Sequence, residues 1–296
     1  MKNIRIPAHF YAFTAMIFWG MSFIWSSILL KYYQPITIIL FRLLLSSAFL
    51  FFILRFFWQE EKIQKKDIRL IVLSALFNPF LYFLGENYGL KYSTPTLASV
   101  VIATIPVFSP LVAFLTVREK LTSINLVGIG ISFIGVVLML IRKDLSFETD
   151  VRGIIFLFCA VISALFYSVL LRKLTVKYSA LLLIACQNLI GVILFIPLFL
   201  IFDLKTIHEI RLNGEIIASY ILLSILASSL SFVFFAHSVK LIGISKTNIF
   251  SNLIPVFTAF FSFLFLSEIF SAQKIAGILL VVGGVYLSER NKPGLG

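Results

Sequence analysis

The sequence predicts an all-α integral membrane protein with ten transmembrane helices in two inverted five-helix repeats. Three observations predict this fold: an apolar composition, ten apolar runs of membrane-spanning length, and an internal duplication. Of the 296 residues, 60% are hydrophobic and 13% are charged, and the mean hydropathy is +1.05. Soluble domains carry about 25% charged residues, and one soluble core cannot bury this much apolar surface. We therefore expect a lipid bilayer to surround the chain.

The apolar runs set the positions of the expected helices. A helix needs roughly 20 mostly apolar residues to cross about 30 Å of hydrocarbon. Runs of this kind lie at residues 9–30, 35–57, 68–89, 94–117, 123–141, 152–171, 180–202, 216–240, 244–267 and 272–288. The first run is too long for the apolar part of a cleaved signal peptide, so we expect it to be the first helix. Cys159 and Cys186 lie inside runs at different depths, and we expect no disulfide between them.

The basic residues predict the orientation of the chain. The net charge is +12, but Lys and Arg fall in the short gaps between apolar runs, so we expect no nucleic-acid partner. With the N-terminus inside, sixteen of them fall in inner gaps and eight in outer gaps. Cytoplasmic loops of membrane proteins are enriched in Lys and Arg. We predict a multi-pass protein of the cell (inner) membrane with both termini in the cytoplasm.

An internal repeat relates the two halves of the chain. The tetrapeptide Ile-Pro-Val-Phe at residues 105–108 recurs at residues 254–257, a shift of 149. The same shift gives twelve identities between residues 105 and 138 and their counterparts, including a glutamate and two glycines. We expect one repeat over residues 1–147 and the second over residues 148–296. Because each repeat has an odd number of helices, the second enters the membrane in the opposite direction. Inverted repeats of this kind are a recurring plan of secondary transporters.

Several motifs resemble one transporter family. They are Trp19-Gly20-x-Ser22, the run from Tyr88 to Ser93, Arg118-Glu119-Lys120-Leu121, and the pair Gly128 and Gly135. With them the chain resembles the EamA branch of the drug/metabolite transporter superfamily over both halves. The resemblance implies a ten-helix inverted-repeat fold with both termini cytoplasmic, and it favours export. The second half has Ser267-Glu268-Ile269-Phe270 in place of the Arg-Glu-Lys-Leu motif, so only the glutamate is shared there.

Polar residues inside the runs are candidates for a substrate site. A charge at the centre of a membrane helix costs at least about 2.5–3.5 kcal/mol, so Arg42 and Glu86 need a reason to be there. They either line a substrate path or form a structural salt bridge. Other polar residues form stripes at helical spacing, which in a membrane face protein or a wet cavity. The substrate-binding candidates are Trp19, Arg42, Asn78, Tyr82, Glu86, Gln187, Asn248 and Asn252.

Two further groups of residues predict helix geometry. Pro79, Pro106 and Pro255 lie within runs and are expected to kink their helices, and matched interruptions in two repeats point to a transporter site. Gly128 and Gly135, like Gly277 and Gly284, lie seven residues apart on one helix face. Small residues let membrane helices approach closely, so we assign these glycines to packing.

The sequence favours a transporter over an enzyme. There is no Walker A motif, no HExxH motif and no Ser/His/Asp set in plausible proximity, and we expect no catalytic residue, cofactor or metal. The predicted function is secondary transport of small organic metabolites such as amino acids, by alternating access at a central cavity between the repeats. One alternative is a nucleotide-sugar or drug carrier of the same superfamily. The other is an intramembrane lipid-modifying enzyme, which needs clustered His, Asp or Glu. The expected partners are the metabolite and the bilayer, with a monomer or homodimer as the assembly.

Overall fold

The computed structural model describes residues 8–57, 61, 63–108, 123–140, 149–205, 213–243, 247–269 and 271–289, and every regular element among them is helical. Six helical stretches are long and apolar enough to cross a membrane, and four shorter apolar helices accompany them. The ten correspond in order to the ten expected helices. The part of the fourth expected helix after residue 108 and the Arg118–Leu121 motif lie outside the described residues.

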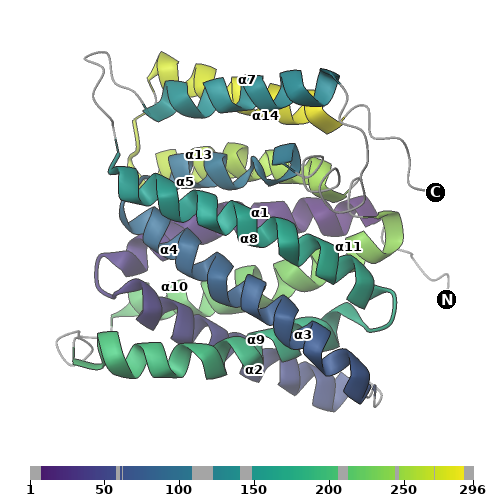
Figure 1. The fold of residues 1–296 in the computed structure, drawn as a ribbon. Helices are drawn as coiled ribbons and strands as arrows, with labels where there is room; N and C mark the ends of the chain where they lie inside the picture. Colours follow the sequence, from purple (N-terminus) through teal and green to yellow (C-terminus); the bar gives the residue numbers. More distant parts are fainter. Residues whose placement is uncertain are drawn as a thin grey trace, which may run out of the picture.

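The helices lie roughly along one direction in stacked layers, with α7 and α14 at one edge and α2 and α9 at the other (Figure 1). The α-helices are α1 (Ala8–Leu30), α2 (Pro35–Phe57), α3 (Ile68–Ala75), α4 (Tyr82–Lys91), α5 (Pro95–Ile102), α7 (Ser123–Leu140), α8 (Val151–Thr175), α9 (Ala180–Leu198), α10 (Gly214–Leu222), α11 (Ser231–Ile242), α13 (Leu253–Leu266) and α14 (Ala272–Glu289). Three π-helical segments extend or join them: η2 (Leu76–Leu81), η3 (Phe199–Asp203) and η5 (Leu223–Leu230). Two short 3₁₀ turns are η1 (Lys65–Asp67) and η6 (Ile249–Asn252).

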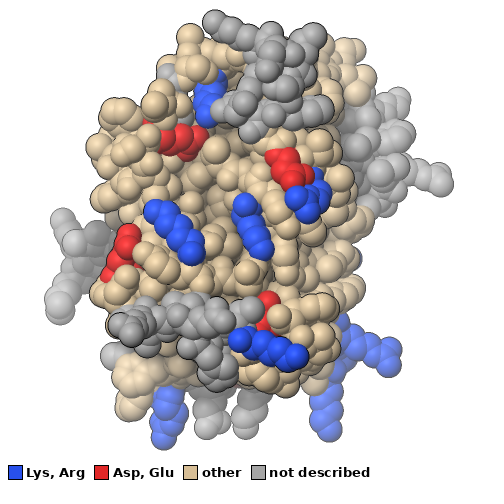
Figure 2. Space-filling view, turned by 90° about the vertical axis from the view of Figure 1, so that its left-hand side faces the viewer, with Lys and Arg blue, Asp and Glu red and all other residues tan. Residues whose placement is uncertain are grey.

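The outer faces of the bundle are apolar. Large side chains such as Phe52, Ile201 and Phe263 are more than half exposed, which in water would leave an apolar surface far larger than that of a soluble monomer. Charged side chains are instead seen at the end of the bundle, where basic and acidic residues are interspersed among uncharged ones (Figure 2). Cys159 and Cys186 are both free, as predicted. The bundle is therefore a multi-pass membrane protein.

The predicted interruption at Pro79 is present. It falls in the π-helical segment η2, where Asn78 has a non-helical backbone with φ −142° and ψ 118°. Proline has no N–H to donate and its ring excludes the carbonyl of the preceding turn. The backbone departs from the α-helix at this point, about midway between the start of α3 and the end of α4.

The interruptions near Pro106 and Pro255 have a different form from the expected kink. Helix α5 ends at Ile102 and helical structure resumes at residues 105–108, while α13 begins at Leu253 after the 3₁₀ turn η6. Each proline therefore lies in the first turn of a resumed helix rather than in the middle of a continuous one. The expectation of mid-helix kinks is wrong in this respect. The N–H groups of a first turn have no partner within the helix, so proline costs little there. The two interruptions are nevertheless matched between the repeats.

Helices α2 and α9 pack side by side. At the N-terminal end of each helix, a carboxylate from the far end of the other helix accepts hydrogen bonds. Glu61, which follows α2, accepts hydrogen bonds of 3.0 and 3.1 Å from the backbone N–H of Ser179, the residue that caps α9. Asp203, which ends the η3 extension of α9, accepts bonds of 2.9 and 2.8 Å from the N–H and hydroxyl of Thr37 in the first turn of α2. Carboxylates stabilise helix N-termini. The reciprocal contacts make α2 and α9 antiparallel, as an inverted repeat requires.

Helices α7 and α14 cross in close contact at their glycines. A methyl group on Gly135 would lie 2.8 Å from the carbonyl oxygen of Gly277, and one on Gly284 would lie 2.6 Å from that of Gly128. The Ser132 hydroxyl donates to the Val281 carbonyl at 3.2 Å. Ser132 and Val281 are themselves 149 residues apart, and the two glycine contacts exchange under the same shift. The predicted role of these glycines in packing is confirmed, and the crossing has the symmetry of the duplication.

Candidate functional site

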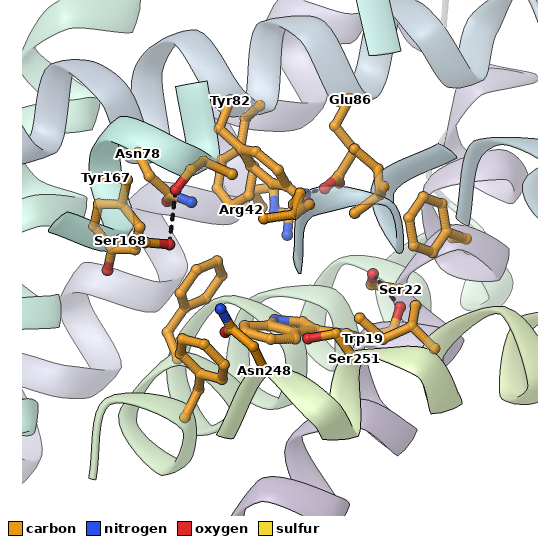
Figure 3. A pocket seen from close by; sticks show the side chains of 18 residues that line it. Trp19, Ser22, Arg42, Asn78, Tyr82, Glu86, Tyr167, Ser168, Asn248 and Ser251 are labelled. Atoms are coloured by element: carbon orange, nitrogen blue, oxygen red, sulfur yellow. Dashed lines mark hydrogen bonds and ion pairs between the residues drawn. The ribbon is translucent and has the colours of Figure 1, made fainter. Parts of the chain in front are cut away.

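A cavity lies between the two repeats (Figure 3). It encloses about 710 Å³ of space between atoms, part of which is open to the outside. Its lining is Trp19, Ser22, Phe23, Arg42, Asn78, Tyr82, Phe83, Glu86, Ile102, Ile105, Ala164, Tyr167, Ser168, Phe232, Phe235, Asn248, Ser251 and Ile254. Both halves of the chain contribute to it, so the cavity is a product of their association.

The lining follows the symmetry of the duplication. Four pairs of lining residues are related by the shift of 149 residues: Phe83 with Phe232, Glu86 with Phe235, Ile102 with Ser251, and Ile105 with Ile254. Residues at equivalent places in two inverted repeats meet only around the axis that relates them. The cavity therefore lies at the repeat interface, where inverted-repeat transporters bind their substrates.

The two predicted intramembrane charges lie together on one wall of the cavity. Arg42 Nη1 lies 3.7 Å from Glu86 Oε1, and the two side chains are 1% and 7% exposed. Arg42 Nε donates a 2.8 Å hydrogen bond to Ser228 Oγ, and the guanidinium carbon lies 4.0 Å from the centre of the Phe83 ring. The repeat partner of Glu86 is Phe235, so among the described lining residues both charges come from the first repeat.

Aromatic side chains form the opposite wall. The Trp19 ring lies with its centre 5.0 Å from that of Phe232 and 5.1 Å from that of Phe235, within the range of favourable aromatic pairs. The Trp19 Nε1 atom is buried and has no hydrogen-bond partner among the described residues. Arg42 and Trp19 face each other across the cavity (Figure 3). Two buried donors beside the cavity, Trp19 Nε1 and Arg42 Nη1, therefore have no hydrogen-bond partner among the described residues.

Six of the eight predicted site residues line the cavity: Trp19, Arg42, Asn78, Tyr82, Glu86 and Asn248. The predicted lining position of Gln187 is a correction, because its amide lies behind the wall. There it accepts from the Tyr167 hydroxyl at 3.2 Å and donates to Ser74 Oγ at 2.9 Å. The place of Gln187 in the second repeat is near that of Arg42 in the first, but its shorter side chain is held by these two partners.

Asn252 is the second correction. It is buried outside the lining, and Ser251 lines the cavity in its place. The α-helical spacing of four residues puts Asn252 on the face of Asn248. In the 3₁₀ turn η6, however, there are three residues per turn, so the residue three positions after Asn248 shares its face. Ser251 is that residue.

Of the remaining polar lining residues, Ser22 lies with Trp19 on one of the predicted polar stripes. Tyr167, Ser168 and Ser251 are not predicted from the sequence. A serine inside a span is typical of helix packing, since Ser is common where membrane helices approach closely.

Comparison with known proteins agrees with this architecture. The model of the EamA-like transporter family matches twice, at residues 6–141 and 151–290. A protein named as an uncharacterized transporter from Archaeoglobus fulgidus is 30% identical over 92% of this chain and 94% of its own length. The uncharacterized transporter YcxC of Bacillus subtilis is 24% identical over 98% and 95%. A solved crystal structure shares the fold, with a TM-score of 0.71 and 17% identity over 97% of this chain and 100% of its own. The chain therefore belongs to the EamA-like transporter family and is a membrane transporter, not an enzyme.

Proposed function

We propose that this transporter exports small amphipathic organic metabolites that carry a carboxylate, with amino acids as the substrate class, by alternating access at the central cavity. The observation that carries this proposal is the bonding of Arg42. Its Nε is committed to Ser228, whereas Nη1 has no hydrogen-bond partner among the described residues. The 3.7 Å separation from Glu86 is too long for a hydrogen bond. A carboxylate is the natural ligand for such a guanidinium, because its two oxygens match the paired N–H donors.

The rest of the lining suits the apolar part and the amine of such a substrate. Trp19, Phe232 and Phe235 offer an aromatic surface for an aliphatic or aromatic side chain. Tyr82 and Trp19 are also suited to cation–π attraction of an ammonium group, and Glu86 is suited to pair with it. A zwitterion with an apolar side chain therefore finds a partner for each of its groups.

The lining argues against a polyphosphate substrate such as a nucleotide sugar. Arg42 is the one basic side chain among the described lining residues. One cation cannot neutralise several phosphate charges, for which proteins use clusters of Arg and Lys. The amphipathic metabolite is the better match on charge alone.

The proposal also includes location and direction. The sixteen-to-eight distribution of Lys and Arg supports a cell (inner) membrane protein with both termini in the cytoplasm. With that orientation, α1 begins on the cytoplasmic side, and transport outward follows the resemblance of the motifs to exporters of this family. The assembly is proposed to be a monomer or a homodimer.

A metabolite efflux screen tests the proposal. Cells that over-express the chain are expected to release one or more amino acids faster than cells with the Arg42→Ala variant. Arg55→Ala is a matched control, because Arg55 lies on the same helix but is exposed at its end. It should behave as the wild type at equal membrane abundance. Equal release of all amino acids by the wild type and Arg42→Ala would refute the proposed substrate class.

A further inference from the structure

A buried polar cluster lies behind Arg42 and joins the two repeats. It consists of Arg42 and Ser46 on α2, Ser228 and Ser229 on η5, and Asn188 on α9, each at most 5% exposed. Ser46 and Ser229 are 2.6 Å apart, and Asn188 Nδ2 donates to Ser46 Oγ at 2.7 Å and to the Ser228 carbonyl at 3.1 Å. Apart from Arg42, these residues do not line the cavity. The cluster therefore acts on the cavity only through Arg42.

The π-helical form of η5 brings its serines to this place. In an α-helix a serine hydroxyl bonds to a carbonyl three or four residues earlier, as Ser224 does with Tyr220. Ser228 and Ser229 instead donate to carbonyls five residues earlier, those of Leu223 and Ser224, at 3.1 and 2.8 Å. The wider turn presents two consecutive serines to α2. Wide turns of this kind often occur at functional sites.

The hydrogen-bond directions in the cluster are fixed. A backbone carbonyl can only accept, so the hydroxyl hydrogen of Ser228 is committed to Leu223. Its oxygen is left to accept from Arg42 Nε, which can only donate. The hydroxyl hydrogen of Ser229 is committed to Ser224 in the same way, so its oxygen accepts from Ser46. The Ser228 hydroxyl hydrogen therefore points to the Leu223 carbonyl and not to the guanidinium, so the serine oxygen stays available as the acceptor for Arg42.

This bond determines which way the guanidinium faces. Ser228 holds the Nε edge, and Phe83 lies against one face with its ring centre 4.0 Å from the guanidinium carbon. A planar group held at one edge and one face has little freedom to rotate. The Nη donors are left on the side away from Ser228, and the side chain faces the cavity and Trp19 in Figure 3. Pre-oriented donors bind a ligand more tightly because less freedom is lost on binding.

We propose that Ser228 is a positioning residue that orients Arg42 for the carboxylate of the substrate. This inference rests on the proposed role of Arg42. In this proposal, a residue of the second repeat, Ser228, orients the charged side chain of Arg42, which belongs to the first repeat. Loss of the Ser228 hydroxyl leaves Arg42 charged and present but free to turn toward Glu86, so carboxylate recognition weakens while the cavity keeps its shape.

Uptake into proteoliposomes tests the proposal, with L-leucine and L-leucinamide as probes that differ in the carboxylate. The variants are Ser228→Ala, Arg42→Ala and the matched control Ser229→Ala. The control removes a hydroxyl of the same size from the same segment without touching Arg42. Ser228→Ala should raise the KM for leucine about tenfold, the order expected for a weakened hydrogen bond to a charged group. The maximal rate should stay within about twofold of the wild type, the KM for leucinamide should not change, and Ser229→Ala should preserve the discrimination between the probes.

The outcomes separate this inference from the proposed function. If Arg42→Ala still discriminates between the probes, or if the wild type transports neither, the proposed function fails and the positioning role with it. If Arg42→Ala loses the discrimination and Ser228→Ala retains it, only the positioning role is overturned. Equal effects of Ser228→Ala and Ser229→Ala also overturn it. If Ser228→Ala fails to fold, the bond is tested in the wild type by hydrogen exchange of the Arg42 Nε–H. Slow exchange is expected, and rapid exchange would contradict the bond to Ser228.

Discussion

Substitution of Arg42 and Glu86, singly and together, should reveal an energetic coupling between the two side chains. The size of this coupling follows from the distance between their charges. At a separation of 3.7 Å, two unit charges attract by about 4.5 kcal/mol at an effective dielectric constant of about 20 and by about 1.1 kcal/mol in bulk water. The side chains are 1% and 7% exposed, which favours the upper figure, whereas water in the cavity lowers it. We expect a coupling of about 2–4 kcal/mol between these limits.

A double-mutant cycle measures this coupling. Arg42→Met and Glu86→Gln should each lower the free energy of unfolding, by about 3–5 kcal/mol where a fully buried charge is left alone. The double variant should cost less than the sum of the two, because it leaves no isolated charge. Unfolding in mixed detergent micelles, followed by the fluorescence of the native tryptophans, gives the four free energies. A coupling below about 0.5 kcal/mol, the usual error of additivity, would refute the reasoning.

Three further predictions address coupling, packing and topology. Glu86→Gln should abolish any pH dependence of the transport rate per molecule of protein in the membrane, because Glu86 is the one carboxylate among the described lining residues. Efflux is measured across a pH series and normalised to membrane abundance, and an unchanged pH dependence with normal flux would assign Glu86 a structural role. Gly284→Ala should lower the free energy of unfolding by about 1–3 kcal/mol, because the added methyl group would meet the Gly128 carbonyl oxygen at 2.6 Å. Gly283→Ala is its control with open space around it, and equal melting of the two variants would contradict the packing argument. A phosphatase that is active only in the periplasm should be inactive when fused after Gly296, and activity there would contradict cytoplasmic termini.

The fold could be predicted from the sequence because each of its two main constraints fixes the type of residue at particular positions. Lipid requires apolar runs of a fixed length, and these runs match the ten helices. The close crossing of α7 and α14 requires glycine, so glycine occupies both Gly135 and the position 149 residues later, Gly284. The form of the interruptions could not be predicted. Proline indicates where an α-helix fails, but whether the backbone then adopts a π-helical segment, as at Pro79, or a turn and a new helix, as at Pro106, depends on packing.

The lining of the cavity could be predicted most directly at the charged residues, whose chemistry leaves them few possible roles inside a membrane. Arg42 and Glu86 stand out because an unpaired charge in lipid is costly, and the structure brings them to the same wall of the cavity. Gln187 and Asn252 were misplaced because an amide inside a span can bond to other helices as readily as it can face a cavity. Asn252 in addition depends on the local number of residues per turn, which helical periodicity alone does not supply.

The symmetry of the cavity and the asymmetry of its charges have separate consequences for transport. Residues such as Ile105 and Ile254 occupy equivalent places in the two repeats, so an exchange of conformation between the repeats would turn the cavity to the other side with little net change in apolar packing. Two states of similar free energy are what a ligand needs in order to shift their populations. The charged pair does not take part in this exchange, because Phe235 stands at the place equivalent to Glu86. In the proposed mechanism, Arg42 therefore holds the substrate from the first repeat in both states, and its orientation is maintained while the second repeat moves against it. The bond from Arg42 to Ser228 crosses that boundary between the repeats, so in the proposed mechanism it links substrate binding to the change of conformation.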